Sequence, residues 1–151
     1  MRVLIHTIRL SMVAGIIGCL FYTTATTPNR RSVSLTMIPL QTIQKSLPTA
    51  VGFGQPSRAV RGAIELTNNE GRSVGYCFQT SPVGDKAIGF SGPSNLLLVC
   101  DQTDRICGIS VLSSTDTRDH VSSVQKDHAF WGQVLGKTLD DVKNMSLNTW
   151  H

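Results

Sequence analysis

Eight residues in two short stretches of the chain could together bind a polar ligand. They are Ser91, Gly92, Pro93 and Ser94 in the first stretch, and Thr115, Asp116, Thr117 and His120 in the second. A glycine allows the backbone to approach a ligand closely, while hydroxyl groups and the free N–H groups of a helix start can bind phosphate or carbonyl oxygens. By composition alone, the same residues also fit a bend in a strand, a helix cap and a histidine on a helix surface.

A hairpin is expected to bring the two stretches together. Residues 94–100 and 105–112 are rich in apolar and β-branched side chains, and the polar residues 101–104 between them are typical of a turn. The two open ends of a hairpin lie side by side, so residues 91–94 should meet residues 113–120. The run Leu-Leu-Leu-Val at residues 96–99 is apolar on both faces, which indicates a strand covered on each side.

The remaining pattern predicts one small α+β domain. Residues 59–67 and 72–80 form a second predicted hairpin, and residues 36–47 have apolar side chains at helical spacing before Pro48. Asp116 or Thr117 can cap one short helix and Asp127 another, residues 138–142 suggest a helical turn, and residues 49–56 are expected to form a loop. The predicted fold is a small antiparallel sheet of two hairpins with short packed helices, preceded by an N-terminal membrane segment.

The N-terminal segment carries an uncharged run at residues 10–22. Together with residues 3–8 it approaches the ~20 residues that a membrane-spanning helix needs. We expect residues 1–24 to be a signal peptide or a membrane anchor, with a lipoprotein cleavage site at Cys19 as a third alternative. A buried core helix is the reading that we favour least. A polar linker at residues 25–35, the domain at residues 36–143 and an unpatterned tail at residues 144–151 complete the organisation.

The charge distribution argues against nucleic-acid binding. The formal net charge is +4, and Arg2, Arg9, Arg30 and Arg31 precede the first acidic residue. The basic and acidic residues after them balance, so the predicted domain has no excess of positive charge for a phosphate backbone.

The cysteines are expected to be small buried side chains. No Cys-x-x-Cys pair is present, so the sequence does not indicate a zinc or iron–sulfur site. In the predicted hairpin of residues 94–100 and 105–112, Cys107 faces Leu98, and Cys100 is its diagonal neighbour. Diagonal Cα atoms are ~7–8 Å apart, which is too far for easy bridging.

Residues 37–142 resemble the FMN-binding domain family, and most closely its NosR-like branch. This domain also occurs in the flavin subunits of the sodium-pumping quinone reductase and Rnf complexes. The resemblance is carried by Gly75-Tyr76, by Thr80-Ser81-Pro82, by residues 89–97 (Gly-Phe-Ser-Gly-Pro-Ser-Asn-Leu-Leu), by residues 114–121 (Ser-Thr-Asp-Thr-Arg-Asp-His-Val), by Phe130-Trp131 and by Leu135-Gly136-Lys137.

The resemblance implies a membrane-tethered module for electron transfer or redox regulation. Its cofactor would be FMN, held by the eight residues named at the outset, and its partners would be membrane-bound redox proteins. The domain would lie on the periplasmic side of a bacterial inner membrane, tethered there or secreted to the periplasm.

One family feature does not occur in this chain. Family members typically attach FMN through a threonine in a Ser-Gly-Ala-Thr motif near the domain end, where this sequence has Met-Ser-Leu-Asn-Thr-Trp-His at residues 145–151. The alternative is therefore a flavin-free, degenerate member that acts as an envelope protein-interaction module. A hydrolase has little support, since no Gly-x-Ser-x-Gly motif is present.

Overall fold

The computed structural model describes residues 2–21, 33–88 and 91–145. The helices are α1 (Arg2–Phe21), η1 (Leu35–Met37), α2 (Leu40–Gln44), η2 (Val83–Lys86), α3 (Arg118–Gln125), α4 (His128–Trp131) and α5 (Leu139–Lys143). The strands are β1 (Gly52–Pro56), β2 (Ile64–Thr67), β3 (Ser73–Gln79), β4 (Ser94–Asp101) and β5 (Ile106–Ser114). Residues 146–151 of the tail expected at residues 144–151, and residues 25–32 of the expected linker, lie outside the described residues.

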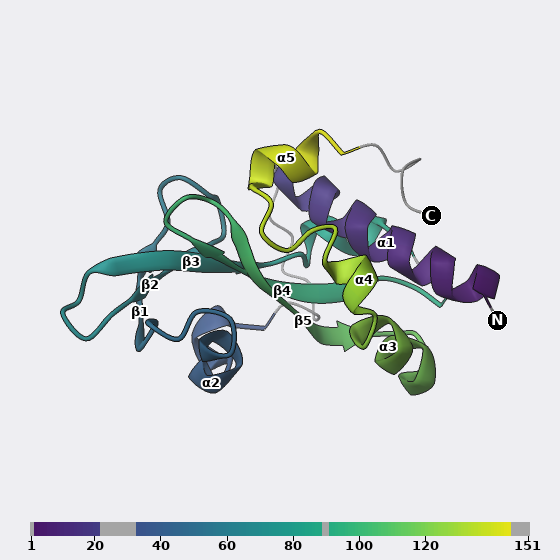
Figure 1. Cartoon of the computed structure of the whole chain (residues 1–151), viewed down its shortest axis with the longest axis horizontal. Coiled ribbons are helices and arrows are strands. Elements are labelled where there is room, and N and C mark those ends of the chain that lie inside the picture. The colour runs from purple at the N-terminus through teal and green to yellow at the C-terminus, as the bar shows by residue number, and fades with distance from the viewer. Residues whose placement is uncertain (1, 22–32, 89–90, 146–151) are drawn as a thin grey trace.

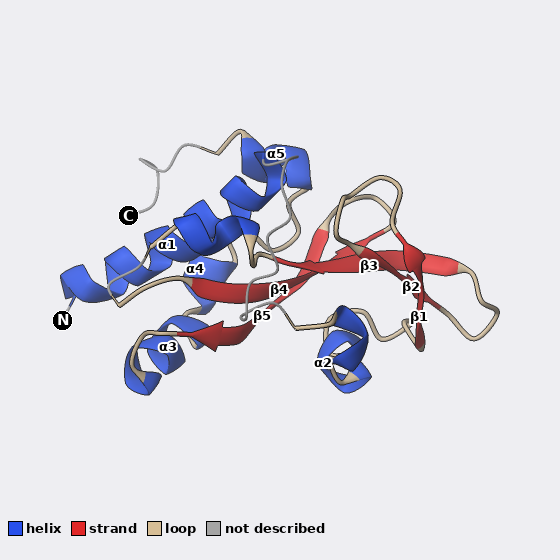
Figure 2. Cartoon of the chain, turned by 180° about the vertical axis from the view of Figure 1, so that it is seen from behind, coloured by secondary structure: helices blue, strands red, loops and turns tan. Residues whose placement is uncertain are grey.

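Five strands form one antiparallel sheet in chain order, from β1 at one edge to β5 at the other. Helices α1, α4 and α5 lie over one face, and α2 lies over the other (Figures 1 and 2). The α+β class and both predicted hairpins are therefore confirmed. The β2–β3 and β4–β5 hairpins lie side by side through the pairing of β3 with β4.

The sheet has one strand more than its sequence predicts. Residues 52–56, which we expected to form a loop, are strand β1 and pair with β2. Glycine and proline weaken a strand, but they are tolerated at a sheet edge. A side chain at Gly54 would be crowded, because its Cβ atom would lie 3.1 Å from Cγ2 of Thr67.

Strand β4 separates two hydrophobic cores, as the run at residues 96–99 predicts. Leu96 and Leu98 belong to the core under α1, α3, α4 and α5, and Leu97 and Val99 belong to the core under η1 and α2. All four side chains are buried. Strand β4 is thus covered on both faces, although it is the neighbour of the edge strand β5.

The N-terminal helix α1 is part of the first core, the arrangement that the sequence led us to favour least. Ile8, Met12, Val13 and Ile16 are fully or almost fully buried and pack with residues of β3 and β4. Among the described residues, no helix is both long enough and apolar enough to cross a membrane. Met12, Val13 and Ile16 of the apolar run therefore pack on the sheet.

Two details of the prediction are wrong. The helix expected at residues 36–47 is divided into η1 and α2, with Pro39 at the N-cap of α2. In the β4–β5 hairpin Leu98 pairs with Ile109 and not with Cys107. The pairing begins with Cys100 opposite Ile106, and the register then shifts between Val99 and Cys100. Such a bulge places an extra residue in one strand and could not be derived from the apolar pattern.

Candidate functional site

The open end of the β4–β5 hairpin gathers most of the residues that the sequence singled out. Ser94 at the start of β4 pairs with Ser114 at the end of β5. Their hydroxyl oxygens are 2.8 Å apart. The expectation that this hairpin brings residues 91–94 beside the stretch that begins at Ser113 is confirmed.

Residues 91–92, before β4, lie close to residues 115–116, after β5. The backbone N–H of Ser91 donates to Oδ1 of Asp116, at 2.9 Å. Gly92 has a φ of 134°, and a Cβ atom there would lie 2.4 Å from Oγ1 of Thr115. Only glycine fits this close approach between the two segments.

Asp116 is the most unusual residue of this cluster. It is 8% exposed, and its other carboxylate oxygen, Oδ2, is buried with no hydrogen-bond partner among the residues that the structure describes. Its backbone N–H donates to Oγ of Ser114, at 3.2 Å. Burial of a carboxylate oxygen costs free energy when no donor bonds to it. A ligand that donates a hydrogen bond to Oδ2 would offset this cost.

Thr117 and His120 pair with each other at the start of α3. Thr117 is the N-cap residue, but its side chain makes no capping bond. Its Oγ1 instead lies 2.9 Å from Nδ1 of His120. Thr117 is exposed, and Pro93 is half-buried. The helix predicted from Asp116 or Thr117 is confirmed, whereas capping by the Thr117 hydroxyl is wrong.

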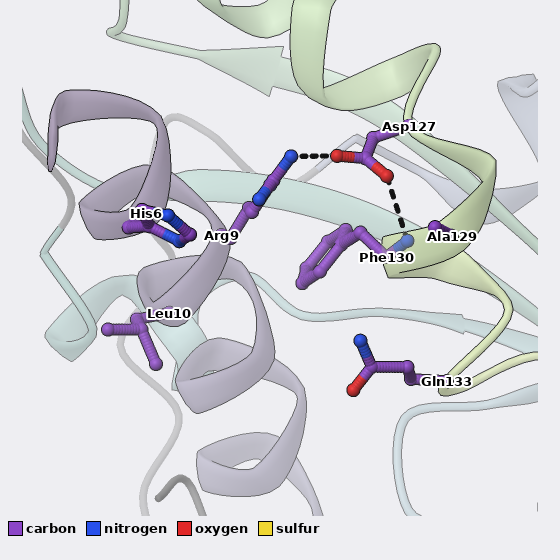
Figure 3. Close-up of a pocket in the computed structure, with 7 residues that line it drawn as sticks. All are labelled: His6, Arg9, Leu10, Asp127, Ala129, Phe130 and Gln133. Atoms are coloured by element: carbon purple, nitrogen blue, oxygen red, sulfur yellow. Dashed lines mark hydrogen bonds and ion pairs between the residues drawn. The ribbon is translucent and has the colours of Figure 1, made fainter. Parts of the chain in front are cut away.

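A pocket of about 220 Å³ lies elsewhere, between α1 and α4 (Figure 3). Its lining residues are His6, Arg9, Leu10, Asp127, Ala129, Phe130 and Gln133. Arg9 forms an ion pair with Asp127, and its guanidinium carbon lies 5.7 Å from the ring centroid of Phe130. The sequence did not predict this pocket. Arg9 lies within an apolar helix, and a charged side chain there indicates an acidic partner elsewhere in the chain.

The structure describes the side chains of three cysteines, Cys77, Cys100 and Cys107. Cys77 and Cys100 are fully buried, and burial raises the pKa of each thiol to about 12. Cys107 is partly exposed, and all three are free, in agreement with the expectation that no bridge joins Cys100 and Cys107. No group of three or more histidine, cysteine or acidic side chains within the described residues could hold a metal ion.

Comparisons with protein-family models, with curated proteins and with solved structures find no match to this chain. The argument for a function therefore depends on the residues of the chain itself and on their geometry.

Proposed function

We propose that this protein is an FMN-binding module for electron transfer or redox regulation, tethered to a membrane. The observation that carries the proposal is the buried carboxylate oxygen of Asp116, which has no donor among the described residues. The resemblance of residues 37–142 to the FMN-binding domain family supports it.

The chemistry of the cluster fits parts of FMN. The flavin ring carries one N–H donor between two carbonyl groups, and the ribityl chain carries hydroxyl groups, so either could donate to Oδ2 of Asp116. Thr115 and Ser91 are exposed and add hydroxyl groups near this carboxylate. The N–H groups of the first turn of α3 could donate to a carbonyl oxygen, as helix starts commonly do.

The phosphate of FMN is the part that this cluster fits least well. Asp116 and Asp119 are both negative, and the cation of the first turn is the exposed Arg118. We therefore expect the cluster to hold the ring or the ribityl chain. When bound, FMN would supply the electron transfer, while these residues would bind and orient it.

The proposed setting is the periplasmic side of a bacterial inner membrane, with membrane-bound redox proteins as partners. The alternative setting is secretion to the periplasm. Both follow from the family resemblance and from the order of charged and apolar residues at the N-terminus.

Titration of the flavin-free protein with FMN, followed by flavin fluorescence, tests the proposal. Replacement of Asp116 by alanine should weaken binding about 10- to 100-fold, since a hydrogen bond to a charged group contributes ~1.5–3 kcal/mol. Asp140→Asn is a matched control, because Asp140 is exposed on α5 and far along the chain from the cluster. Equal affinity of Asp116→Ala and wild type would contradict the proposed site.

A flavin-free interaction module of the cell envelope is the second candidate. The absence of a Ser-Gly-Ala-Thr motif from the sequence favours it. A protein that is folded by circular dichroism, yet leaves flavin fluorescence unchanged throughout the titration, would select this candidate.

A further inference from the structure

Three side chains of α1 form one wall of the pocket between α1 and α4. His6, Arg9 and Leu10 lie at positions i, i+3 and i+4, so they share one face of the helix. Leu10 is 39% exposed, and the side chain of Arg9 is 26% exposed. Phe130 of α4 and Gln133, just after α4, line the other side (Figure 3). Segments from the two ends of the chain therefore build one pocket.

The hydrogen-bonding groups of this pocket have donors left over. Both carboxylate oxygens of Asp127 are used, because Oδ2 accepts from the guanidinium of Arg9 and Oδ1 accepts from the backbone N–H of Phe130. A guanidinium carries several N–H donors, and the Nε–H of Arg9 is buried without an acceptor among the described residues. Within the same part of the chain, the Gln133 amide is also unpaired. A ligand with an acceptor group fits this inventory.

The rest of the lining suits an apolar ring. Leu10 and Ala129 contribute aliphatic side chains, and Phe130 contributes its ring. The guanidinium carbon of Arg9 lies 5.7 Å from the centroid of the Phe130 ring, so the charge and the apolar surface are neighbours. The volume is about 220 Å³. An apolar cavity of ~150 Å³ can hold benzene, so this pocket has room for one six-membered ring with a small substituent.

We propose that this pocket binds a small aromatic acid as its carboxylate, with the carboxylate at Arg9 and the ring against Leu10 and Phe130. Hydrogen bonds from arginine to a carboxylate are among the strongest polar contacts in proteins. A few polar groups in a mostly apolar lining are typical of small-molecule sites. A cationic ligand fits less well, because it would have to displace Arg9 or the Phe130 N–H from Asp127.

Titration of the full-length protein with sodium benzoate, followed by amide chemical shifts in nuclear magnetic resonance, tests this inference. We expect shifts that saturate and that centre on the side-chain amide of Gln133 and the backbone amide of Phe130. Three related compounds each lack one feature of the ligand: acetate lacks the ring, benzamide lacks the charge, and benzylamine has the opposite charge. Each should bind at least about tenfold more weakly than benzoate.

Two variants of the pocket should weaken benzoate binding. Gln133→Ala should do so about three- to tenfold, and Arg9→Gln about tenfold or more, since a hydrogen bond to a charged group contributes more than a neutral one. Circular dichroism shows whether Arg9→Gln folds without its ion pair, and Gln133→Ala decides the test if it does not. Gln41→Ala is the matched control, because Gln41 is exposed on α2, over the opposite face of the sheet.

Three results would overturn the inference. Benzoate could cause no saturating shift at the pocket, benzamide could bind as tightly as benzoate, or Gln133→Ala could bind benzoate as tightly as Gln41→Ala does. None of these readouts involves flavin or Asp116, so the carboxylate pocket and the proposed flavin site can fail separately.

Discussion

Arg9 of α1 and Asp127, the N-cap residue of α4, form an ion pair across a sequence separation of 118 residues. Oδ1 of the same aspartate accepts a hydrogen bond from the backbone N–H of Phe130, at 2.8 Å. Both side chains are largely shielded from solvent, with 26% and 18% exposure. One carboxylate therefore starts a helix and also joins that helix to α1.

A double-mutant cycle should resolve these two roles of Asp127. Asparagine caps a helix about as well as aspartate, so Asp127→Asn should keep the cap and lose only the ion pair. We expect Arg9→Gln and Asp127→Asn each to reduce the free energy of unfolding, with a coupling of about 1 kcal/mol. Urea denaturation of the four proteins measures this coupling, and a value indistinguishable from zero would contradict the docking of α1 on α4.

The contact between Gly15 and Gly84 makes a second prediction about α1. Gly84→Ala should reduce stability by about 1–3 kcal/mol, because the added methyl group has no room against the α1 backbone. Gly18→Ala, on α1 itself, meets no atom within 4 Å and should be neutral or stabilising by up to about 1 kcal/mol. Equal thermal midpoints for Gly84→Ala and wild type would show that α1 does not pack here.

The buried thiols should resist alkylation. In a Cys19→Ser background at pH 8, iodoacetamide should modify the partly exposed Cys107 slowly, since burial also raises the pKa of its thiol. Cys77 and Cys100 should stay unmodified, since burial raises their pKa values to about 12. All three should react in urea. Mass spectrometry of the peptides gives the result, and rapid labelling of Cys77 in the folded protein would contradict the buried position of β3.

Tyr76 should make stability depend on alkaline pH. Burial, followed by a 2.7 Å hydrogen bond to Asp104, raises the pKa of its phenol above the ordinary value of 10.0. The stabilisation of the folded protein by Tyr76 is complete below pH 10 and decreases at higher pH, because the unfolded chain then loses the phenol proton first. The free energy of unfolding falls by up to about 1.4 kcal/mol per pH unit.

Urea unfolding of wild type and Tyr76→Phe at pH 8 and pH 11 measures this effect. At pH 8 the phenylalanine variant should be about 1 kcal/mol less stable, through loss of the hydrogen bond. At pH 11 the difference in free energy of unfolding between the two proteins should become smaller or change sign. A difference between the two proteins that stays constant with pH would show that Tyr76 does not titrate differently in the folded state.

The sequence predicted the strands best where side-chain alternation and turn residues agree. The hairpins of β2 with β3 and of β4 with β5 follow from such patterns. Strand β1 was missed because Gly52, Gly54 and Pro56 carry turn chemistry, and only pairing with β2 makes them a strand. The packing of α1 on the sheet was not predicted, because an apolar run looks alike whether lipid or a sheet covers it.

The candidate site was predictable in its placement but not in its bonding. Ser91 and Asp116 meet at the open end of the hairpin because they flank its two strands. The unpaired oxygen of Asp116 and the pairing of Thr117 with His120 depend on side-chain rotamers, which local sequence does not specify. The pocket between α1 and α4 joins the two ends of the chain, and no local pattern relates them.

The visible absorption spectrum tests the central claim most directly. The full-length protein would be produced in flavin-replete bacterial cells, purified and scanned before and after acid precipitation, beside Asp116→Ala. We expect a flavin spectrum for wild type, release of the flavin into the acid supernatant, and a much weaker spectrum for Asp116→Ala. A folded wild-type protein with no flavin absorbance, which also fails to take up added FMN, would contradict the claim.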